Sequence, residues 1–258
     1  MSLPVIVLAG ERPGGNPLAQ ALGKSAGILV DVAGKSCVRR VLEALASSES
    51  IATGVMIGPE PSVANGAEMR QLFAVHDLSW LEPATGPAES ALKALNALSD
   101  RPVLITSADH ALLTPEIIDS FCHLALASDA DFVVGLVPYS RVHQAFPRSK
   151  RTLLRFADGT FCGSNLFMIR TEAGLGVVNF WQTMQSHRKR PWRMATELGI
   201  STLLRYLLGR LALRDALDRI GHLAGAHIGH VELLEARAAV DVDSLADHAL
   251  AEQVIGSC

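Results

Sequence analysis

The sequence of 258 residues is poor in aromatic residues and cysteines. Aromatic residues make up only 5% of the chain and charged residues 19%, whereas hydrophobic residues make up 49%. Because nearly half of the side chains are apolar, wholesale disorder is excluded, and a chain of this length can bury a sizeable core. The four cysteines form no Cys-x-x-Cys pair. We interpret them as reduced, mostly buried thiols of a cytoplasmic protein.

Long hydrophobic segments and a strong net charge are also missing. The apolar runs are too short, or too interrupted by glycine or charge, to span a bilayer, and the first of them lacks a preceding basic region. We therefore expect neither a membrane segment nor a signal peptide. The net charge of −3 gives no electrostatic reason to expect nucleic acid as a partner. The one basic run, residues 188–193, is interpreted as a solvated helix end, with binding of an anionic acceptor as the alternative.

Several common catalytic motifs are absent. The chain contains neither Gly-x-Gly-x-x-Gly nor Gly-x-x-x-x-Gly-Lys-[Ser/Thr], which argues against a dinucleotide-dependent oxidoreductase and against a P-loop NTPase. Gly-x-Ser-x-Gly is missing too, so no hydrolase signature is formed.

What the sequence does contain is an alternation of short strands and helices. Apolar runs rich in Val, Ile and Leu predict buried strands at residues 5–9, 54–57, 103–106, 132–137 and 166–169. Helical patterns lie between them at residues 37–46, 87–98 and 115–127, the last with Thr114 as its N-cap. This alternation predicts an α/β fold with three layers, α/β/α, around a mostly parallel sheet.

The second half of the chain has a different pattern. Residues 174–224 show helical periodicity and are not flanked by a flexible linker, so we expect a helical insertion within a single domain of residues 1–258. Strands are expected again at residues 228–234 and 239–242, and a last helix is expected after Ser244.

Ligands of open α/β sheets bind at the carboxyl ends of the strands, so the segments that follow the strands are the candidate sites. The first strand runs into a turn with Gly10, Arg12, Gly14 and Gly15, whose amides could surround a phosphate. Such a turn alone is a weak signal, since glycine-rich turns after strands are common.

Two further segments carry carboxylates. Asp109 directly follows a predicted strand and is well placed to hold a hard cation, although a turn or capping role is the simpler interpretation. The next residue, His110, is expected to lie in a surface turn. Asp241 and Asp243 share one face of an extended segment, where they repel each other unless a cation or a basic group joins them. The alternative is that Asp243, by itself or with Ser244, caps the last helix.

Taken in order, these segments resemble the MobA-like nucleotidyltransferases of molybdenum-cofactor type, within the nucleotide-diphospho-sugar transferase (GT-A-like) fold. The matching stretches are Leu8-Ala9-Gly10 with Arg12 and Gly14, Val32-Ala33-Gly34-Lys35, Thr85-Gly86-Pro87-Ala88-Glu89-Ser90, Ser107-Ala108-Asp109, Gly163-Ser164-Asn165, and Asp241-Val242-Asp243-Ser244-Leu245-Ala246-Asp247. Each is moderately specific, and their common order carries the resemblance.

The resemblance implies an enzyme that transfers a nucleoside monophosphate from a nucleoside triphosphate to a small phosphorylated or hydroxyl acceptor, with release of pyrophosphate. It also implies roles for individual residues. Arg12, Lys24 and Asp109 are the expected catalytic residues, Asp109 and Asp243 the expected Mg²⁺ ligands, and Gly163 and Asn165 the expected acceptor contacts. The nucleotide is expected to lie against Leu8, Ala9, Gly10, Arg12, Gly14, Gly86, Pro87 and Ser90.

One position departs from the family pattern. Where the family has a lysine that contacts the triphosphate, this chain has Gly27, and Lys24 lies three residues earlier. This departure leaves open a catalytically impaired nucleotide-binding relative. A glycosyltransferase of the same fold that uses a nucleotide sugar is a separate alternative.

Overall fold

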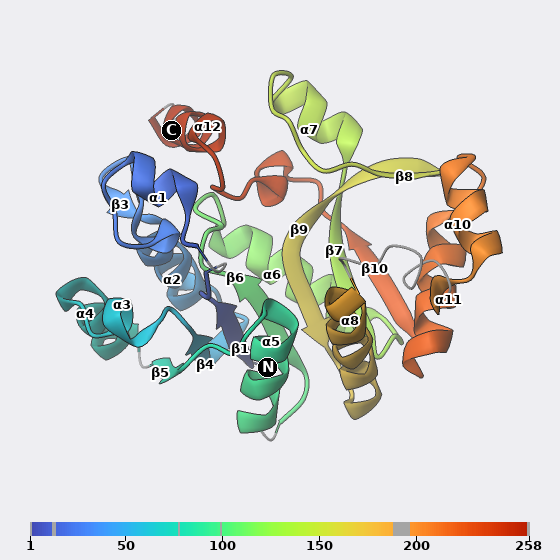
Figure 1. Cartoon of the computed structure of the whole chain (residues 1–258), viewed down its shortest axis with the longest axis horizontal. Coiled ribbons are helices and arrows are strands. Elements are labelled where there is room, and N and C mark those ends of the chain that lie inside the picture. Colours follow the sequence, from blue (N-terminus) through green and yellow to red (C-terminus); the bar gives the residue numbers. More distant parts are fainter. Residues whose placement is uncertain (1, 12–13, 77, 99, 188–196, 257–258) are drawn as a thin grey trace.

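The computed structural model describes residues 2–11, 14–76, 78–98, 100–187 and 197–256. Within them, helices cover both faces of a mixed and mostly parallel sheet, which confirms the predicted α/β fold with three layers (Figure 1). Arg12 and the basic run of residues 188–193 lie outside the described residues, as do the expectations attached to them.

In the described part of the chain, the sheet contains eight strands in the order β10-β7-β9-β6-β1-β4-β5, with β8 paired to β9. All neighbouring pairs along this order are parallel except those that β9 makes with β6 and β7. The strands are β1 (Leu3–Leu8), β4 (Ile51–Ile57), β5 (Leu78–Leu81), β6 (Val103–Ser107), β7 (Phe132–Pro138), β8 (Leu154–Phe156), β9 (Gly159–Ile169) and β10 (Ile228–Glu232). The predicted strands at the centre of the sheet are thus confirmed, several of them longer than expected.

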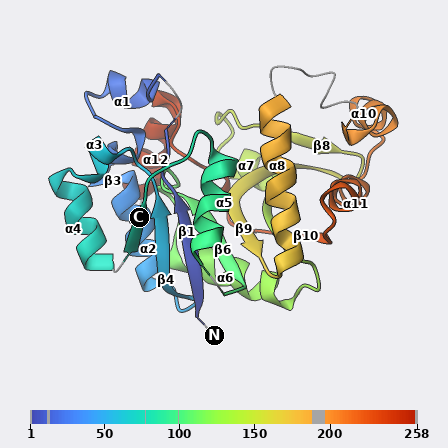
Figure 2. The same ribbon diagram turned by 60° about the horizontal axis from the view of Figure 1, so that its bottom comes forward.

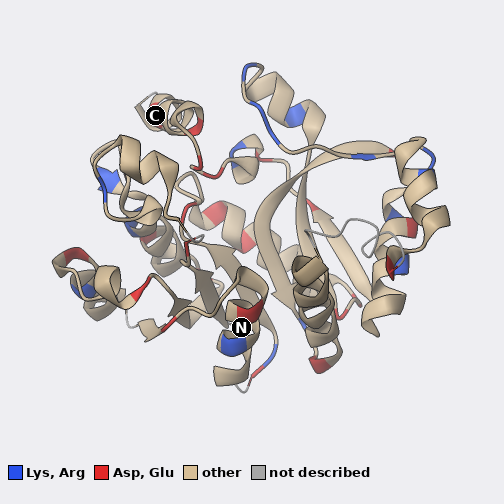
Figure 3. Ribbon diagram, viewed as in Figure 1, with Lys and Arg blue, Asp and Glu red and all other residues tan. Residues whose placement is uncertain are grey.

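The central strands are buried because both of their faces are covered. In β1, the side chains of Val5 and Val7 pack into the core on one face, and that of Ile6 packs into the core on the other. The strands β1, β4, β6, β7 and β9 carry no charged residue, and Figure 3 shows the charges on helices and loops around them. A strand buried on both faces has no position for an exposed charge, which explains its continuous apolar sequence.

The helices form the two outer layers. One face is covered by α2 (Cys37–Ser47) and α6 (Pro115–Ala127), and the other by α5 (Pro87–Ala97), α8 (Leu175–His187) and α11 (Leu213–Ala224) (Figure 2). The remaining helices lie at the ends and edges: α1 (Pro17–Ala21), α3 (Pro61–Ala64), α4 (Ala67–His76), α7 (Tyr139–Ala145), α10 (Ile200–Leu207) and α12 (Leu245–Gly256). Thr114 caps α6 as predicted, because its side chain accepts a hydrogen bond from the Ile117 N–H. In the part of the chain described, no helix has the length and apolar character needed to cross a membrane.

The expectation of a strand at residues 239–242 was wrong. A short 3-10 helix occupies Ala236–Ala239, and the residues after it are extended without a strand partner. The alternation that predicted the strand is real, since Val240 and Val242 are buried, but the Val240 N–H bonds back to Arg237. The segment packs on the end of the sheet instead of joining it.

Candidate functional site

The carboxyl ends of β1 and β6 meet side by side. In the parallel ladder Leu8 pairs with Ser107, and the Ala108 N–H then donates to the Leu8 carbonyl oxygen at 2.9 Å. Ala9 is buried and Gly10 is exposed, so the chain leaves the sheet between these two residues. The turn that begins at Gly10 and the turn that holds Asp109 therefore start next to each other.

A glycine that sequence analysis did not single out supports the first turn. Gly58, after β4, has a φ of +85°, and a Cβ atom there would lie 2.7 Å from the carbonyl carbon of Ala9 and the nitrogen of Gly10. The backbone after β4 thus packs directly on the peptide where β1 ends, which only glycine permits. A Gly-Pro pair directly after a strand was the signal available in the sequence.

The turn before α5 lies against the same loop. A Cβ atom on Gly10 would be 3.7 Å from the Cβ of Pro83. Gly86 is the N-cap of α5, Pro87 follows as its first residue, and the buried Ser90 hydroxyl accepts a hydrogen bond from the Ala84 N–H at 3.0 Å. Of the residues expected to contact the nucleotide, the structure thus groups Leu8, Ala9 and Gly10 with Gly86, Pro87 and Ser90.

The third component is the segment that carries Asp241 and Asp243. The Val242 N–H donates to the Asp109 carbonyl oxygen at 3.1 Å, so this segment is bonded to the turn after β6. Val242 is buried, whereas Asp243, next to it, is exposed at the edge of the sheet. The structure therefore brings together the two carboxylates, Asp109 and Asp243, that sequence analysis paired.

Asp109 is an electrostatically unusual carboxyl group. Burial raises its pKa from the ordinary value of 3.8 to about 6; the nearby Ser107 hydroxyl lowers it, while the negative charges of Asp241 and Asp243 raise it further. Among the described residues, its buried Oδ1 atom has no hydrogen-bond partner. A cation would relieve both the repulsion and the missing contact.

These residues fit a divalent cation that arrives with its own ligands. Across the described ranges, no three or more His, Cys, Asp or Glu side chains group together so that they could hold a metal ion. Mg²⁺, however, is usually bound through one or two carboxylates together with waters and substrate phosphates. The pair of Asp109 and Asp243 meets that requirement.

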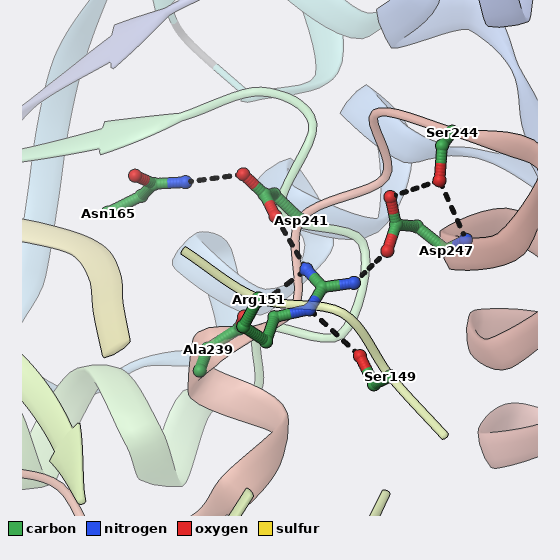
Figure 4. Close-up of polar contacts among 7 residues, drawn as sticks. All are labelled: Ser149, Arg151, Asn165, Ala239, Asp241, Ser244 and Asp247. Atoms are coloured by element: carbon green, nitrogen blue, oxygen red, sulfur yellow. Dashed lines mark hydrogen bonds and ion pairs between the residues drawn. The ribbon is translucent and has the colours of Figure 1, made fainter. Parts of the chain in front are cut away.

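Asp241 differs from Asp109 because it forms an ion pair with a basic side chain, that of Arg151. Arg151, in the loop between α7 and β8, donates from Nη1 to the Asp241 Oδ1 at 2.9 Å and forms an ion pair with Asp247 (Figure 4). The other oxygen of Asp241 accepts from Asn165 Nδ2 at 3.4 Å. Sequence analysis missed Arg151, since nothing in its neighbourhood along the chain marks it.

A cleft of about 390 Å³ opens beside these groups. It contains both residues expected to contact the acceptor, Gly163 and Asn165, and a Cβ atom on Gly163 would meet nothing within 4 Å. Asn165 has a φ of +52° at an irregularity of the β7–β9 ladder, which turns it out of the regular strand. The other lining residues are Lys150, Arg151, Thr152, Leu154, Cys162, Ala239, Asp241, Asp243 and Asp247.

A larger, more open hollow of about 590 Å³ lies beside β3 (Lys35–Ser36) and α4, away from these residues.

The structure also shows where His110 lies and which residue caps the last helix. His110 is not a surface histidine: it is 1% exposed, because the segment of Val240 and Val242 packs over its turn, and burial lowers its pKa to about 4. The N-terminus of α12 is capped by Ser244, whose hydroxyl accepts from the Asp247 N–H at 3.2 Å and donates to the Asp247 carboxylate at 2.6 Å.

At Gly27, where the family has a lysine, the side chain of Asn16 occupies the space beside the backbone. A Cβ atom on Gly27 would lie 2.2 Å from Nδ2 of Asn16, whose side chain also caps α1. The Gly27 N–H donates to the carboxylate of Glu11. Lys24 forms an ion pair with Asp31 at the surface. Gly14, with a φ of +100°, is exposed.

Comparison with known proteins agrees with the fold. Residues 5–240 match the model of a family described as the MobA-like NTP transferase domain. A structure from Thermus thermophilus, described as a hypothetical transferase, is 30% identical over 96% of this chain and 100% of its own, with a TM-score of 0.79. No curated protein matches the chain significantly.

More distant structures share the fold. The 4-diphosphocytidyl-2C-methyl-D-erythritol synthase from Anaerococcus prevotii is 9% identical, with a TM-score of 0.60 over 99% of this chain and 96% of its own. The CMP:2-keto-3-deoxy-manno-octonic acid synthetase complexed with CTP is 11% identical, with a TM-score of 0.60 over 99% of this chain and 98% of its own.

We predict that Asp109→Asn stabilises the metal-free protein at neutral pH. The folded pKa of about 6 lies above the unfolded value of 3.8, so ionised Asp109 costs the folded state up to about 3 kcal/mol above pH 6 and nothing below pH 3.8. Urea unfolding in EDTA should show a gain of about 1–3 kcal/mol at pH 7.5 that is largely lost at pH 4. A variant no more stable than the parent at pH 7.5 would contradict the buried, uncompensated carboxylate.

We also predict that Gly27→Ala destabilises the protein by about 1–3 kcal/mol, because the new methyl group collides with Asn16. The matched background is Asn16→Gly, which removes the obstructing amide while keeping a tolerated N-cap residue. In that background Gly27→Ala should cost much less in urea unfolding. Equal costs in the two backgrounds would show that the Asn16 contact is not the constraint.

Proposed function

Because the chain belongs to the MobA-like NTP transferase family, we propose that it transfers a nucleoside monophosphate from a nucleoside triphosphate to a phosphate or hydroxyl acceptor. Family membership supports nucleotidyl transfer in general. The observation that supports the finer proposal is the hydrogen bond between Val242 and Asp109, which joins the segment of Asp243 to the turn of Asp109. The β1–β6 ladder starts the Gly10 turn beside the same residues.

In the proposed reaction an acceptor oxygen attacks the α-phosphorus of the triphosphate. The bond from that phosphorus to the bridging oxygen breaks, and pyrophosphate leaves with the electron pair. The amides after Gly10 and Gly14 would approach the phosphates, and Asp109 and Asp243 would hold Mg²⁺. Bound Mg²⁺ supplies charge neutralisation for the phosphate oxygens. Gly163 and Asn165 line the cleft in which the acceptor would lie.

A second candidate is a relative that binds nucleotide without turnover. The packing of Asn16 at Gly27 favours it, because the Asn16 amide occupies the space where the Cβ atom of the family lysine would lie. Positioned cations are needed where charge develops on phosphate oxygens, so the loss of one lowers catalysis more than binding.

We predict that one of the four ribonucleoside triphosphates raises the melting temperature in the presence of Mg²⁺, because a ligand of the native state stabilises it by mass action. CTP is the first to test, since one distant structural relative is described as complexed with CTP. Asp243→Asn should weaken Mg²⁺-dependent binding by about ten- to a hundredfold. Pyrophosphate release over a panel of phosphorylated and hydroxyl compounds then measures turnover.

The outcomes of this screen separate the candidates. Binding together with pyrophosphate release supports the transferase, and binding without release across the panel supports the non-catalytic relative. Stabilisation by nucleotide sugars but not by triphosphates would indicate a glycosyltransferase. If no nucleotide binds, the proposed function is wrong.

We further predict that Arg12 contributes more to triphosphate binding than Lys24. Arg12→Ala should weaken binding of the Mg²⁺-triphosphate by about ten- to a hundredfold in calorimetry, the cost of a lost charge-assisted hydrogen bond. Lys24→Ala should weaken it by clearly less, because Lys24 is already paired with Asp31. Arg214→Ala, which removes an exposed cation paired with Asp218 on α11, is the control. A larger effect at Lys24 would instead assign the role of the family lysine to that residue.

A further inference from the structure

Arg151 is a buried cation with a full set of partners. Its side chain is only 6% exposed. Its Nε donates to the Ser149 hydroxyl at 2.9 Å, its Nη1 donates to Asp241 at 2.9 Å and approaches the Ala239 carbonyl oxygen at 3.5 Å, and its Nη2 meets Asp247. Three of these four partners belong to the segment of residues 239–247, which is attached to the sheet by no strand ladder.

The contacts continue beyond the guanidinium on both sides. Asp241 is also held by Asn165 of β9, and Asp247 is held by Ser244, which caps α12 (Figure 4). A chain of contacts therefore runs from β9 through Asp241, Arg151 and Asp247 to the last helix. Asp243 lies on the chain segment between the two carboxylates that Arg151 holds.

We infer that Arg151 is a positioning residue for the cation site formed by Asp109 and Asp243. The planar guanidinium engages two carboxylates through different nitrogen atoms, which sets the distance between Asp241 and Asp247 and hence the course of the segment that carries Asp243. It also neutralises these two acidic groups. The inference rests on the proposed function, in which that pair holds Mg²⁺.

The test compares metal affinity with nucleotide affinity. Mn²⁺ replaces Mg²⁺ because its free ion is measured directly by electron paramagnetic resonance, and the titration contains the triphosphate that binds best in the screen. Arg151→Met should weaken Mn²⁺ binding at least tenfold, while triphosphate affinity in EDTA changes less than twofold. Arg151→Lys keeps the charge but lacks the planar, two-sided donor, so its Mn²⁺ affinity should fall between those of the parent and Arg151→Met.

The controls keep the result interpretable. Arg148→Met removes an exposed cation from the same loop and should bind Mn²⁺ like the parent. If Arg151→Met does not fold, Arg151→Lys carries the test. Folded Arg151 variants with the Mn²⁺ affinity of the parent would overturn the inference and leave the proposed function standing. An equal loss of triphosphate affinity in EDTA would overturn it as well, because that would show general damage. A parent protein that binds no triphosphate would refute both.

Discussion

The hydrogen bond from the Val242 N–H to the Asp109 carbonyl oxygen is the contact on which the candidate site depends. It joins the end of β6 to a segment that has no partner strand, and the burial of Val240 and Val242 keeps that segment against the sheet. Because successive side chains of an extended segment point to opposite sides, burying Val242 sends its two acidic neighbours away from the core. One main-chain bond and two buried valines thus determine where Asp241 and Asp243 can act.

Much of the framework could be predicted from local sequence. The strand Phe132–Pro138 and the helix Pro115–Ala127 were found because each combines an uninterrupted physical signal with a clear boundary: an apolar run without charge, and a Thr-Pro start followed by helical spacing. The pairing of Asp109 with Asp243 came from the family resemblance, and the strand argument for it was only half right, because Asp109 follows a strand whereas Asp243 follows an extended segment outside the sheet ladder. The strands and helices of the framework could thus be predicted because each depends on residues that are close together along the chain.

The features that could not be predicted depend on neighbours that are distant along the chain. Arg151 follows Ser149 and Lys150 in a polar loop, and nothing in that loop shows that its guanidinium is buried between Asp241 and Asp247. The extended segment at Val240 was mistaken for a strand because alternating burial does not require a ladder. His110 was placed at the surface because the packing of that segment over its turn is a tertiary event.

Gly27 departs from the family pattern, and the residues around it are packed to suit a glycine at this position. Asn16 fills the space beside Gly27 and caps α1, while Glu11 accepts the Gly27 N–H, so the turn is packed around the absence of a side chain. A cation for the triphosphate must then come from elsewhere. Lys24 is held by Asp31, but this ion pair is exposed, and exposed pairs contribute little stability. A triphosphate that binds this ammonium group has to displace Asp31, so Lys24 contributes less to nucleotide binding than a cation without an ion pair would.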